Sequence, residues 1–186
     1  MAPPARRRAT YDDLLAAPAH HVAEIIDGDL RVQPRPALAH TLAASALGSE
    51  LHGPFQRGRG GPGGWVILDE PELHLGPDVL VPDLAGWRRE RLPLVPEAPA
   101  IELAPDWICE VLSPSTEATD RAQKIPIFAR ERVAFVWLVS PAAQTLEVFV
   151  LDGDTYRLRR VLQGETRAAV EPFEAIELEL GALWAR

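Results

Sequence analysis

The stretch Pro105–Lys124, "PDWICEVLSPSTEATDRAQK", decides the fold of this chain. Its first half is apolar enough for a buried strand, but Glu110 interrupts the apolar run. Because side chains alternate between the faces of a strand, Glu110 is predicted to share a face with Ile108 and Leu112, and Cys109 to face the other way. A buried carboxylate costs roughly several kcal/mol unless it is paired or binds a metal ion. The stretch therefore requires a partner for Glu110.

The same conflict recurs in residues 79–87, "VLVPDLAGW", where Asp83 lies between apolar neighbours. Both carboxylates could lie at strand ends and be solvated, or they could form buried ion pairs with arginines. Alternatively, they could converge on a divalent cation, which favours oxygen ligands and offsets the repulsion between two anions. Spacing alone leaves all three explanations open, although one carboxylate on each of two strands favours a shared reason.

The N-terminal third contains helix and hairpin signals. In "TYDDLLAAP", Thr10 is a plausible N-cap of a short helix that ends near Pro18. Asp27-Gly28 between two apolar runs predicts a tight hairpin turn. Residues 36–55 carry leucines at helical spacing, which predicts an amphipathic helix that Gly53-Pro54 ends.

The rest of the chain is strand-rich, with one main helix at residues 115–132 between the apolar runs 106–112 and 134–140. A helix between two strands predicts one helical crossover. We expect an α/β (α+β) fold with helices first and then a mixed sheet, in a single domain over residues 1–186, with residues 1–9 as a flexible arm. The remaining predicted strands lie at residues 65–75, 79–87, 145–162 and 173–180.

Composition narrows the class of protein. The single cysteine excludes an intrachain disulfide and a cysteine metal cluster, so a reducing cytoplasm fits. Apolar runs stay short of the ~20 residues that cross a bilayer. The formal net charge is −8, whereas proteins that bind a polyanion usually carry a basic face. Tight, constitutive DNA binding is therefore less expected, although a local basic cleft remains compatible with this charge.

The chain resembles a known family over nearly its whole length. Pro82-Asp83 in one strand, followed by Glu110 in the next, resembles the core of the PD-(D/E)XK nucleases. "AEIIDGDLRVQP", "VPDLAGW", "VAFVWLVSP" and above all "EVLSPST" followed by "DRAQK" resemble the Uma-type family, bacterial proteins assigned to the restriction endonucleases. This resemblance implies a restriction-endonuclease-like fold, with a mixed central sheet flanked by helices.

The resemblance also implies a set of site residues. Asp83 and Glu110 would be ligands of Mg²⁺ or Mn²⁺, and the backbone carbonyl of Val111 would be a third ligand. Glu24 would come from the first helical region and bind a second ion or a metal-bound water. The chain departs from the PD-(D/E)XK pattern at Leu112, which stands where that pattern has a lysine.

In the Uma-type pattern the basic residue lies on the next helix, where Lys124 matches it. It would orient the attacking water and stabilise charge on the phosphate. Asp120 and Lys124 are spaced i, i+4, so a surface ion pair is the alternative explanation of both; the resemblance instead makes Asp120 a carboxylate that holds Lys124. His40 could line the cleft or could equally be a half-buried structural histidine.

These residues predict a metal-dependent endonuclease that hydrolyses DNA phosphodiester bonds as a cytoplasmic homodimer. The alternative is a catalytically silent nuclease-fold protein that serves as a binding or regulatory module. Complete occupancy of the four polar positions favours the enzyme, and the acidic net charge favours the alternative. Three arginines in the predicted hairpin 145–162 could form a basic rim for nucleic acid or could protect an edge strand: Arg157, Arg159 and Arg160.

Overall fold

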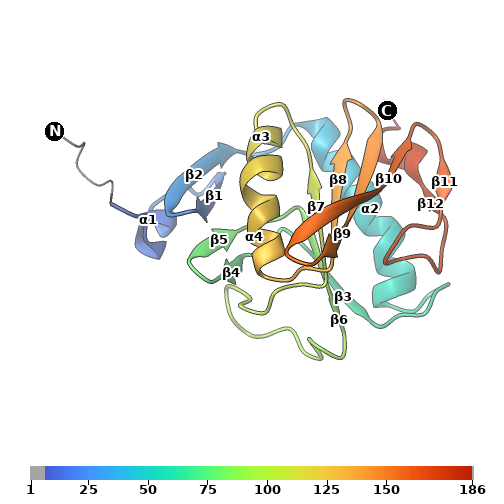
Figure 1. Ribbon diagram of the computed structural model, residues 1–186, viewed down its shortest axis with the longest axis horizontal. Helices are drawn as coiled ribbons and strands as arrows, with labels where there is room; N and C mark the ends of the chain where they lie inside the picture. The colour runs from blue at the N-terminus through green and yellow to red at the C-terminus, as the bar shows by residue number, and fades with distance from the viewer. Residues whose placement is uncertain (1–6, 186) are drawn as a thin grey trace.

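A six-stranded mixed sheet forms the centre of the protein in the computed structural model, which describes residues 7–185 (Figure 1). The strand order is β10-β9-β8-β7-β6-β3. These strands span Trp65–Asp69 (β3), Leu84–Arg88 (β6), Trp107–Val111 (β7), Phe135–Ser140 (β8), Thr145–Asp152 (β9) and Thr155–Gln163 (β10). The predicted mixed sheet is confirmed.

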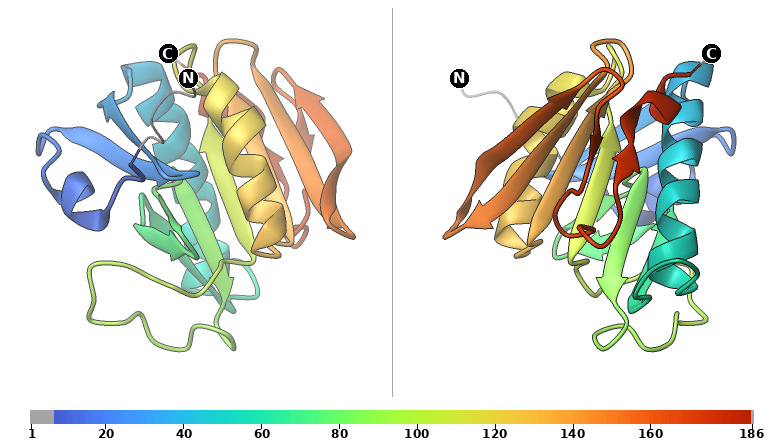
Figure 2. Two further views of the ribbon diagram at one scale, coloured as in Figure 1. Left: turned by 60° about the vertical axis from the view of Figure 1, so that its left-hand side comes forward. Right: turned by 90° about the vertical axis from the view of Figure 1, so that its right-hand side faces the viewer.

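One helical crossover connects the two parallel strands of this sheet. Strands β7 and β8 pair in parallel, whereas the other neighbours in the sheet pair antiparallel. The crossover consists of α3 (Glu117–Thr119), the π-helical segment η2 (Asp120–Lys124) and α4 (Ile125–Arg130). Figure 2 shows this yellow crossover on one face of the sheet and the long helix α2 (Leu38–Leu51) on the other. Helices therefore flank the sheet, as predicted.

The two faces of β7 belong to two different apolar clusters. Cys109 belongs, with Leu47 of α2, to a cluster that also contains Trp107 and Val111 and is called the α2-side cluster. Ile108 belongs, with Phe128 of α4, to a cluster that also contains Leu112 and is called the α4-side cluster. This confirms the predicted alternation, and it places the side chain of Glu110 on the α4 face.

Phe173 stands at the centre of the α2-side cluster. Its ring centroid lies 4.7 Å from that of Phe55, 4.8 Å from Trp65, 5.0 Å from Trp107 and 5.6 Å from Trp137. The predicted strand 173–180 is wrong in its extent, because the chain turns to insert Phe173 among these rings. The C-terminal region contains only short elements: β11 (Arg167–Ala168), β12 (Leu178–Glu179) and the 3₁₀ helix η3 (Leu180–Leu183).

A second, four-stranded sheet has the order β2-β1-β5-β4. Its strands are β1 (His21–Ile26), β2 (Asp29–Pro34), β4 (Leu73–Leu75) and β5 (Asp78–Leu80). Asp27 and Gly28 both have positive φ, 54° and 84°, as a tight hairpin turn requires. Because this turn brings β1 onto β2 before α2 begins, the predicted order of helices first and strands later is wrong.

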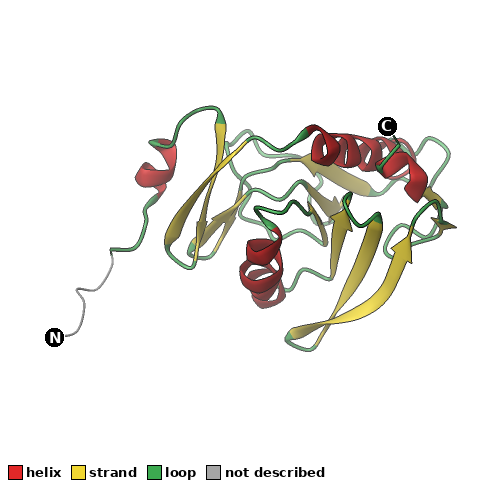
Figure 3. Cartoon of the chain, turned by 90° about the horizontal axis from the view of Figure 1, so that it is seen from above, coloured by secondary structure: helices red, strands yellow, loops and turns green. Residues whose placement is uncertain are grey.

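The short helix α1 (Tyr11–Leu15) precedes this hairpin, and its start is capped as predicted (Figure 3). Thr10 and Asp13 form a capping box, in which each side chain bonds the other's backbone N–H. The backbone N–H of Ala9 donates to the carbonyl of Gly28 over 2.8 Å, and Arg7 pairs with Asp13. The predicted arm, residues 1–9, is thus held at residues 7–9, while residues 1–6 lie outside the described part.

Helix α2 does not end at Gly53-Pro54 as predicted. It continues into the π-helical segment η1 (His52–Gln56). Proline has no backbone N–H to donate to the i→i+4 hydrogen bonds of an α-helix, and a single π turn replaces those bonds locally by i→i+5 bonds. The turn also buries Phe55 against the α2-side cluster. Within residues 7–185, every helix is too short or too polar to cross a membrane.

Candidate active site

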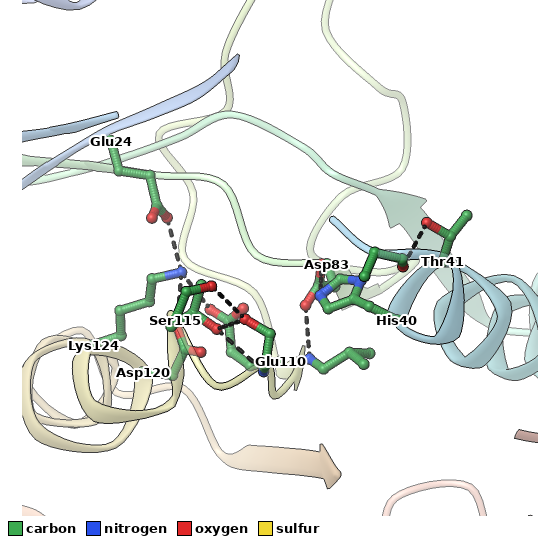
Figure 4. Close-up of polar contacts among 12 residues, drawn as sticks. Glu24, His40, Thr41, Asp83, Glu110, Ser115, Asp120 and Lys124 are labelled. Carbon is green, nitrogen blue, oxygen red and sulfur yellow. Dashed lines mark hydrogen bonds and ion pairs between the residues drawn. The ribbon is translucent and has the colours of Figure 1, made fainter. Parts of the chain in front are cut away.

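A cavity of about 360 Å³ lies where the ends of several elements meet. Figure 4 shows polar side chains that line it, among them Glu24, Asp83 and Lys124. Strand β6 runs antiparallel to β7, so the residue before β6 lies beside the end of β7. Strand β1, the start of α2 and segment η2 complete the lining. All six predicted polar site residues line this cavity: Glu24, His40, Asp83, Glu110, Asp120 and Lys124. The structure therefore brings together residues that are spread over a hundred positions of sequence.

Asp83 is held at both carboxylate oxygens. It immediately precedes β6, and its Oδ2 accepts a 2.6 Å hydrogen bond from the backbone N–H of Val111. Its Oδ1 lies 3.2 Å from Nε2 of His40. The carboxylate thereby caps the end of β7, at the point where β6 no longer pairs with it. These two contacts fix the plane of the Asp83 carboxylate.

His40 lines the cavity. The sequence alone left open whether it lines a cleft or is a half-buried structural histidine. It lies in the first turn of α2, its residue is 9% exposed, and its Nδ1 is buried without a hydrogen-bond partner in residues 7–185. Burial lowers the pKa of this imidazole, but the hydrogen bond and charge of Asp83 outweigh burial. Asp120 and Glu70 add to the effect, so the pKa of His40 is raised overall.

Lys124 lies among three carboxylates. Its Nζ is 2.9 Å from Oε1 of Glu24, 3.2 Å from Oε1 of Glu110 and 3.2 Å from Oδ1 of Asp120. The lysine side chain is only 5% exposed. A pair confined to the surface with Asp120 is therefore excluded, because the ammonium is buried and shared. Figure 4 shows Lys124 reaching from its helix toward Glu24 and Glu110.

Segment η2 explains why Asp120 and Lys124 point the same way. They are its first and last residues, and the N–H of Ile125 donates to the carbonyl of Asp120, the i→i+5 bond of a π turn. This wider turn sets both side chains toward the cavity. The predicted helix at residues 115–132 thus contains a local irregularity just before Pro126.

Glu24 comes from a strand, not from a helical region as predicted. It is the fourth residue of β1, is 2% exposed, and its Oε1 also accepts a 2.9 Å hydrogen bond from the backbone N–H of Val81. The hairpin turn at Asp27-Gly28 already marked this segment as extended. The resemblance identified the correct position but the wrong secondary structure.

The charges in the cavity do not balance. Burial raises the pKa of Glu110, and the ammonium of Lys124 lowers it. The charges of Asp120, Asp83 and Glu24 raise it further, so that the pKa of Glu110 stands well above its ordinary value. Burial lowers the pKa of Lys124, but the three carboxylates around it outweigh burial, so it is raised well above its usual value. Without a further cation, the site favours the charged form of Lys124 and disfavours the charged form of Glu110.

The donor set fits a hard cation. Within residues 7–185, no three His, Cys, Asp or Glu side chains form a metal cluster. Mg²⁺, however, is usually bound by one or two carboxylates plus waters, which Asp83 and Glu110 could supply. The N–H of Val111 points to Asp83. Because a strand residue's N–H and C=O point to the same side, its carbonyl is directed there too.

Two lining residues escaped sequence reasoning. Glu70 follows β3 in a left-handed conformation with φ 46°, and its N–H donates to the carbonyl of Asp83 over 3.1 Å. Arg35, in the segment that connects β2 to α2, lines the same cavity. Neither stands in a motif; the only sequence signal was their place next to prolines, Glu70 before Pro71 and Arg35 between Pro34 and Pro36.

The three arginines that could form either a basic rim or edge-strand protection do not lie at this cavity. Arg157, Arg159 and Arg160 lie on β10, the edge strand of the main sheet. They contact Asp152, Glu171 and the carbonyl of Ala169, respectively. These contacts favour edge-strand protection over an open surface for nucleic acid.

Comparisons with known proteins give a related fold and a family for this chain. A comparison with curated proteins gives no match. Among solved structures, the chain is similar to one described as a "putative nuclease belonging to DUF820 from Anabaena variabilis ATCC 29413". The identity is 23% and the TM-score 0.77, over 95% of this chain and 98% of that chain. This likeness establishes the fold. Residues 8–182 match the model of the family Uma2, described as "Putative restriction endonuclease". The chain therefore belongs to the Uma2 family.

Proposed function

We propose that the protein is a metal-dependent endonuclease that hydrolyses DNA phosphodiester bonds. Asp83, Glu110 and the carbonyl of Val111 would hold Mg²⁺ or Mn²⁺. Lys124 would act on the attacking water and the phosphate. Family membership supports a nuclease, and the chemistry of the cavity supports the finer assignment.

The observation that carries the proposal is the position of Lys124 beside Glu110. The two lie 3.2 Å apart, both buried, at the end of β7. Leu112, which follows on the same face, is packed in the α4-side cluster and offers no charge. Lys124 supplies from the helix the cation that Leu112 lacks. The long, flexible lysine side chain can bring its ammonium to the site from the helix in place of a lysine on the strand.

Each residue has a separate task in this mechanism. When bound, the ion would polarise a phosphate oxygen and lower the pKa of a coordinated water. Asp83 is held rigid by the N–H of Val111 and by His40, which suits a ligand. Lys124 would orient the attacking water and stabilise the negative charge that grows on the phosphate oxygens.

Glu24 and Asp120 would position Lys124. Both contact its ammonium, and Glu24 is itself fixed by the N–H of Val81. This assignment replaces the expected role of Glu24 as a ligand, since the contacts of its Oε1 are to Lys124 and Val81. We expect Glu24 to act through Lys124 and not on the ion directly.

We further propose a homodimer, because a two-fold pair of active sites can cut both strands of a duplex. Sedimentation equilibrium of the purified protein tests this point. A mass near twice 20.4 kDa supports the dimer, and a mass near 20.4 kDa at all concentrations contradicts it.

One observation favours a second function, a catalytically silent binding or regulatory module. The net charge of −8 and the acidic lining oppose spontaneous binding of a polyanion. In that case Lys124 would serve only as the buried counter-ion of its three carboxylates. A single assay of plasmid cleavage distinguishes the two functions.

Incubation of supercoiled plasmid with purified protein, with and without Mg²⁺ or Mn²⁺, tests the proposal. We expect nicked and linear DNA only when the ion is present. Asp83→Asn, which removes one ligand charge, should be inactive under the same conditions. Intact plasmid in all reactions would favour the silent module.

A further inference from the structure

The acidic interior of the cavity opposes the binding of an anionic substrate. Among the described residues, the cavity is lined by two permanent cations, Lys124 and Arg35. Five carboxylates line it as well: Glu24, Glu70, Asp83, Glu110 and Asp120. A phosphodiester anion is repelled from such a site unless cations offset the carboxylates. Lys124 is already shared by three of these carboxylates. Arg35 is the other cation of the lining.

Arg35 is free to bind an anion. Its residue is exposed at the cavity, and its side chain makes no hydrogen bond or ion pair with any residue in the range 7–185. Many other arginines of this protein are paired, as Arg121 is with Glu117 and Glu147. The five N–H donors of the Arg35 guanidinium therefore remain available to a ligand.

The backbone around Arg35 is restricted in advance. Pro34 and Pro36 flank it, and both also line the cavity. Proline fixes its own φ, and it biases the preceding residue toward extended conformations. The segment therefore presents the Arg35 side chain with few alternative backbone conformations, which lowers the entropy lost when the guanidinium binds a ligand.

A second segment brings hydroxyl groups to the same cavity. Ser113, Ser115 and Thr116 follow β7 and line it together with Arg35. Ser113 Oγ lies 3.0 Å from Ser115 Oγ and 3.0 Å from Thr116 Oγ1. Three hydroxyl groups carry three protons, and these two hydrogen bonds use two of them. One hydroxyl proton remains for an acceptor outside the cluster.

We propose that Arg35 and the hydroxyls of Ser113, Ser115 and Thr116 form a phosphate-binding subsite at the mouth of the cavity. Its ligand is a phosphodiester group of the nucleic-acid backbone, next to the group that is cleaved. The proposal rests on the proposed function. A guanidinium donates two parallel hydrogen bonds to a phosphate, and hydroxyls complete the contact.

This subsite accounts for binding despite the acidic interior. Ser115 and Arg35 are exposed, whereas Glu110 and Lys124 are buried. Arg35 thus stands at the entrance together with the exposed Glu70, whereas three of the carboxylates, Glu24, Glu110 and Asp120, are buried at the floor. Because phosphate contacts carry no base information, the subsite predicts binding that does not depend on sequence.

Fluorescence anisotropy with a labelled 16-base-pair DNA duplex tests the subsite. The titration is run in EDTA, so that no divalent ion contributes to binding or cleavage, over a series of low salt concentrations. We expect Arg35→Ala to weaken binding about tenfold or more, because a charge-assisted hydrogen bond is lost. The slope of log K against log salt should fall by about one unit. Arg35→Lys should recover part of the affinity.

Arg57→Ala is the matched control. Arg57 is exposed, makes no side-chain hydrogen bond or ion pair within residues 7–185, and is absent from the cavity lining. Its removal changes the net charge by the same amount. We expect wild-type affinity and an unchanged salt slope. A duplex of a second sequence should give the same difference between the two variants.

Three results would overturn the subsite. Equal affinities for Arg35→Ala and Arg57→Ala would place the phosphate elsewhere, while plasmid cleavage by the wild type would still uphold the proposed function. Competition by millimolar inorganic phosphate as effective as that by unlabelled duplex would identify a free-phosphate site. Absence of duplex binding at the lowest salt would overturn the subsite, and intact plasmid alongside it would overturn the proposed function as well.

Discussion

The ammonium nitrogen of Lys124 lies 3.2 Å from Oε1 of Glu110, although 14 positions of sequence separate the two residues. One stands on a buried strand and the other on the π turn of the crossover helix. Their contact answers the question posed by a carboxylate in an apolar strand: Glu110 is neither solvated nor paired with an arginine. It belongs to a buried cluster that contains more carboxylates than cations.

The first prediction concerns Lys124. Replacing it by methionine keeps the length of the side chain but removes the charge, and leaves three buried carboxylates without a counter-ion. Loss of one partner of a buried pair typically costs about 3–5 kcal/mol of unfolding free energy. We expect the cleavage rate to fall about 10²–10³-fold, the scale for one electrostatic stabiliser of a transition state. Chemical denaturation and plasmid cleavage measure the two effects.

Arg121→Met is the control for Lys124→Met. Arg121 lies on the same helix but pairs with Glu117 and Glu147, away from the cavity. The Arg121→Met variant should cleave plasmid at the wild-type rate. Because a divalent ion can replace the lost ammonium as counter-charge, Mn²⁺ should raise the Tm of Lys124→Met more than that of the wild type. Wild-type cleavage by Lys124→Met would reject the lysine mechanism.

The second prediction concerns the pH dependence of stability. Burial, offset in part by Lys124, raises the pKa of Glu110 well above its ordinary value. An acid whose pKa is raised on folding stabilises the fold most below its unfolded pKa, about 4.3, and this stability is lost as the pH rises through the folded pKa. Glu110→Gln removes the titration and keeps the shape of the side chain.

In EDTA, we therefore expect Glu110→Gln to be more stable than the wild type at pH 8, on the order of 1 kcal/mol. The difference should shrink toward pH 4. Urea denaturation across this range measures it. Glu97→Gln, at an exposed loop position, should show no such trend. A wild type that is more stable than Glu110→Gln at pH 8 would contradict the inferred excess of negative charge among the buried groups of the cavity.

The third prediction separates the two roles of Glu24. Glutamine at this position still accepts the hydrogen bond from Val81 but no longer attracts Lys124. If Glu24 positions Lys124, the Mn²⁺ affinity of Glu24→Gln should stay within about threefold of the wild type, while cleavage falls by roughly tenfold. Calorimetric titration and cleavage rates provide both numbers. A large loss of Mn²⁺ affinity would instead make Glu24 a ligand.

Sequence reasoning could predict the strand that carries Glu110, because alternation along a strand is a local property. It could predict the turn at Asp27-Gly28, because few residue pairs accept two positive φ values. It could not predict that Phe173 turns inward, because that depends on four rings distant in sequence.

The site was predictable only where a motif marked it. Asp83, Glu110 and Lys124 stand in recognisable stretches, whereas Glu70 and Arg35 do not. The contact of His40 with Asp83 depends on how α2 lies against the start of β6, which no local pattern encodes. The resemblance places Glu24 in a helical region, whereas the hairpin signal at Asp27-Gly28 correctly indicates the strand that carries it.

The fourth prediction concerns the core. Phe173 is fully buried among four aromatic rings. Phe173→Ala should lower the unfolding free energy by about 3–5 kcal/mol, because it removes a large apolar side chain and leaves a cavity. Leu94→Ala, at a position that is 82% exposed, should change it by less than about 0.5 kcal/mol. Equal effects in urea denaturation would contradict the central role of Phe173.

An anomalous difference map of a crystal soaked in Mn²⁺ tests the central claim most directly. The account predicts one peak between Asp83 and Glu110, coordinated directly by carboxylate oxygens of both and by the carbonyl of Val111. The same soak of Asp83→Asn should give a weaker peak or none. A wild-type map without a peak at the end of β7, or with manganese bound only elsewhere, would contradict the metal site and the mechanism built on it.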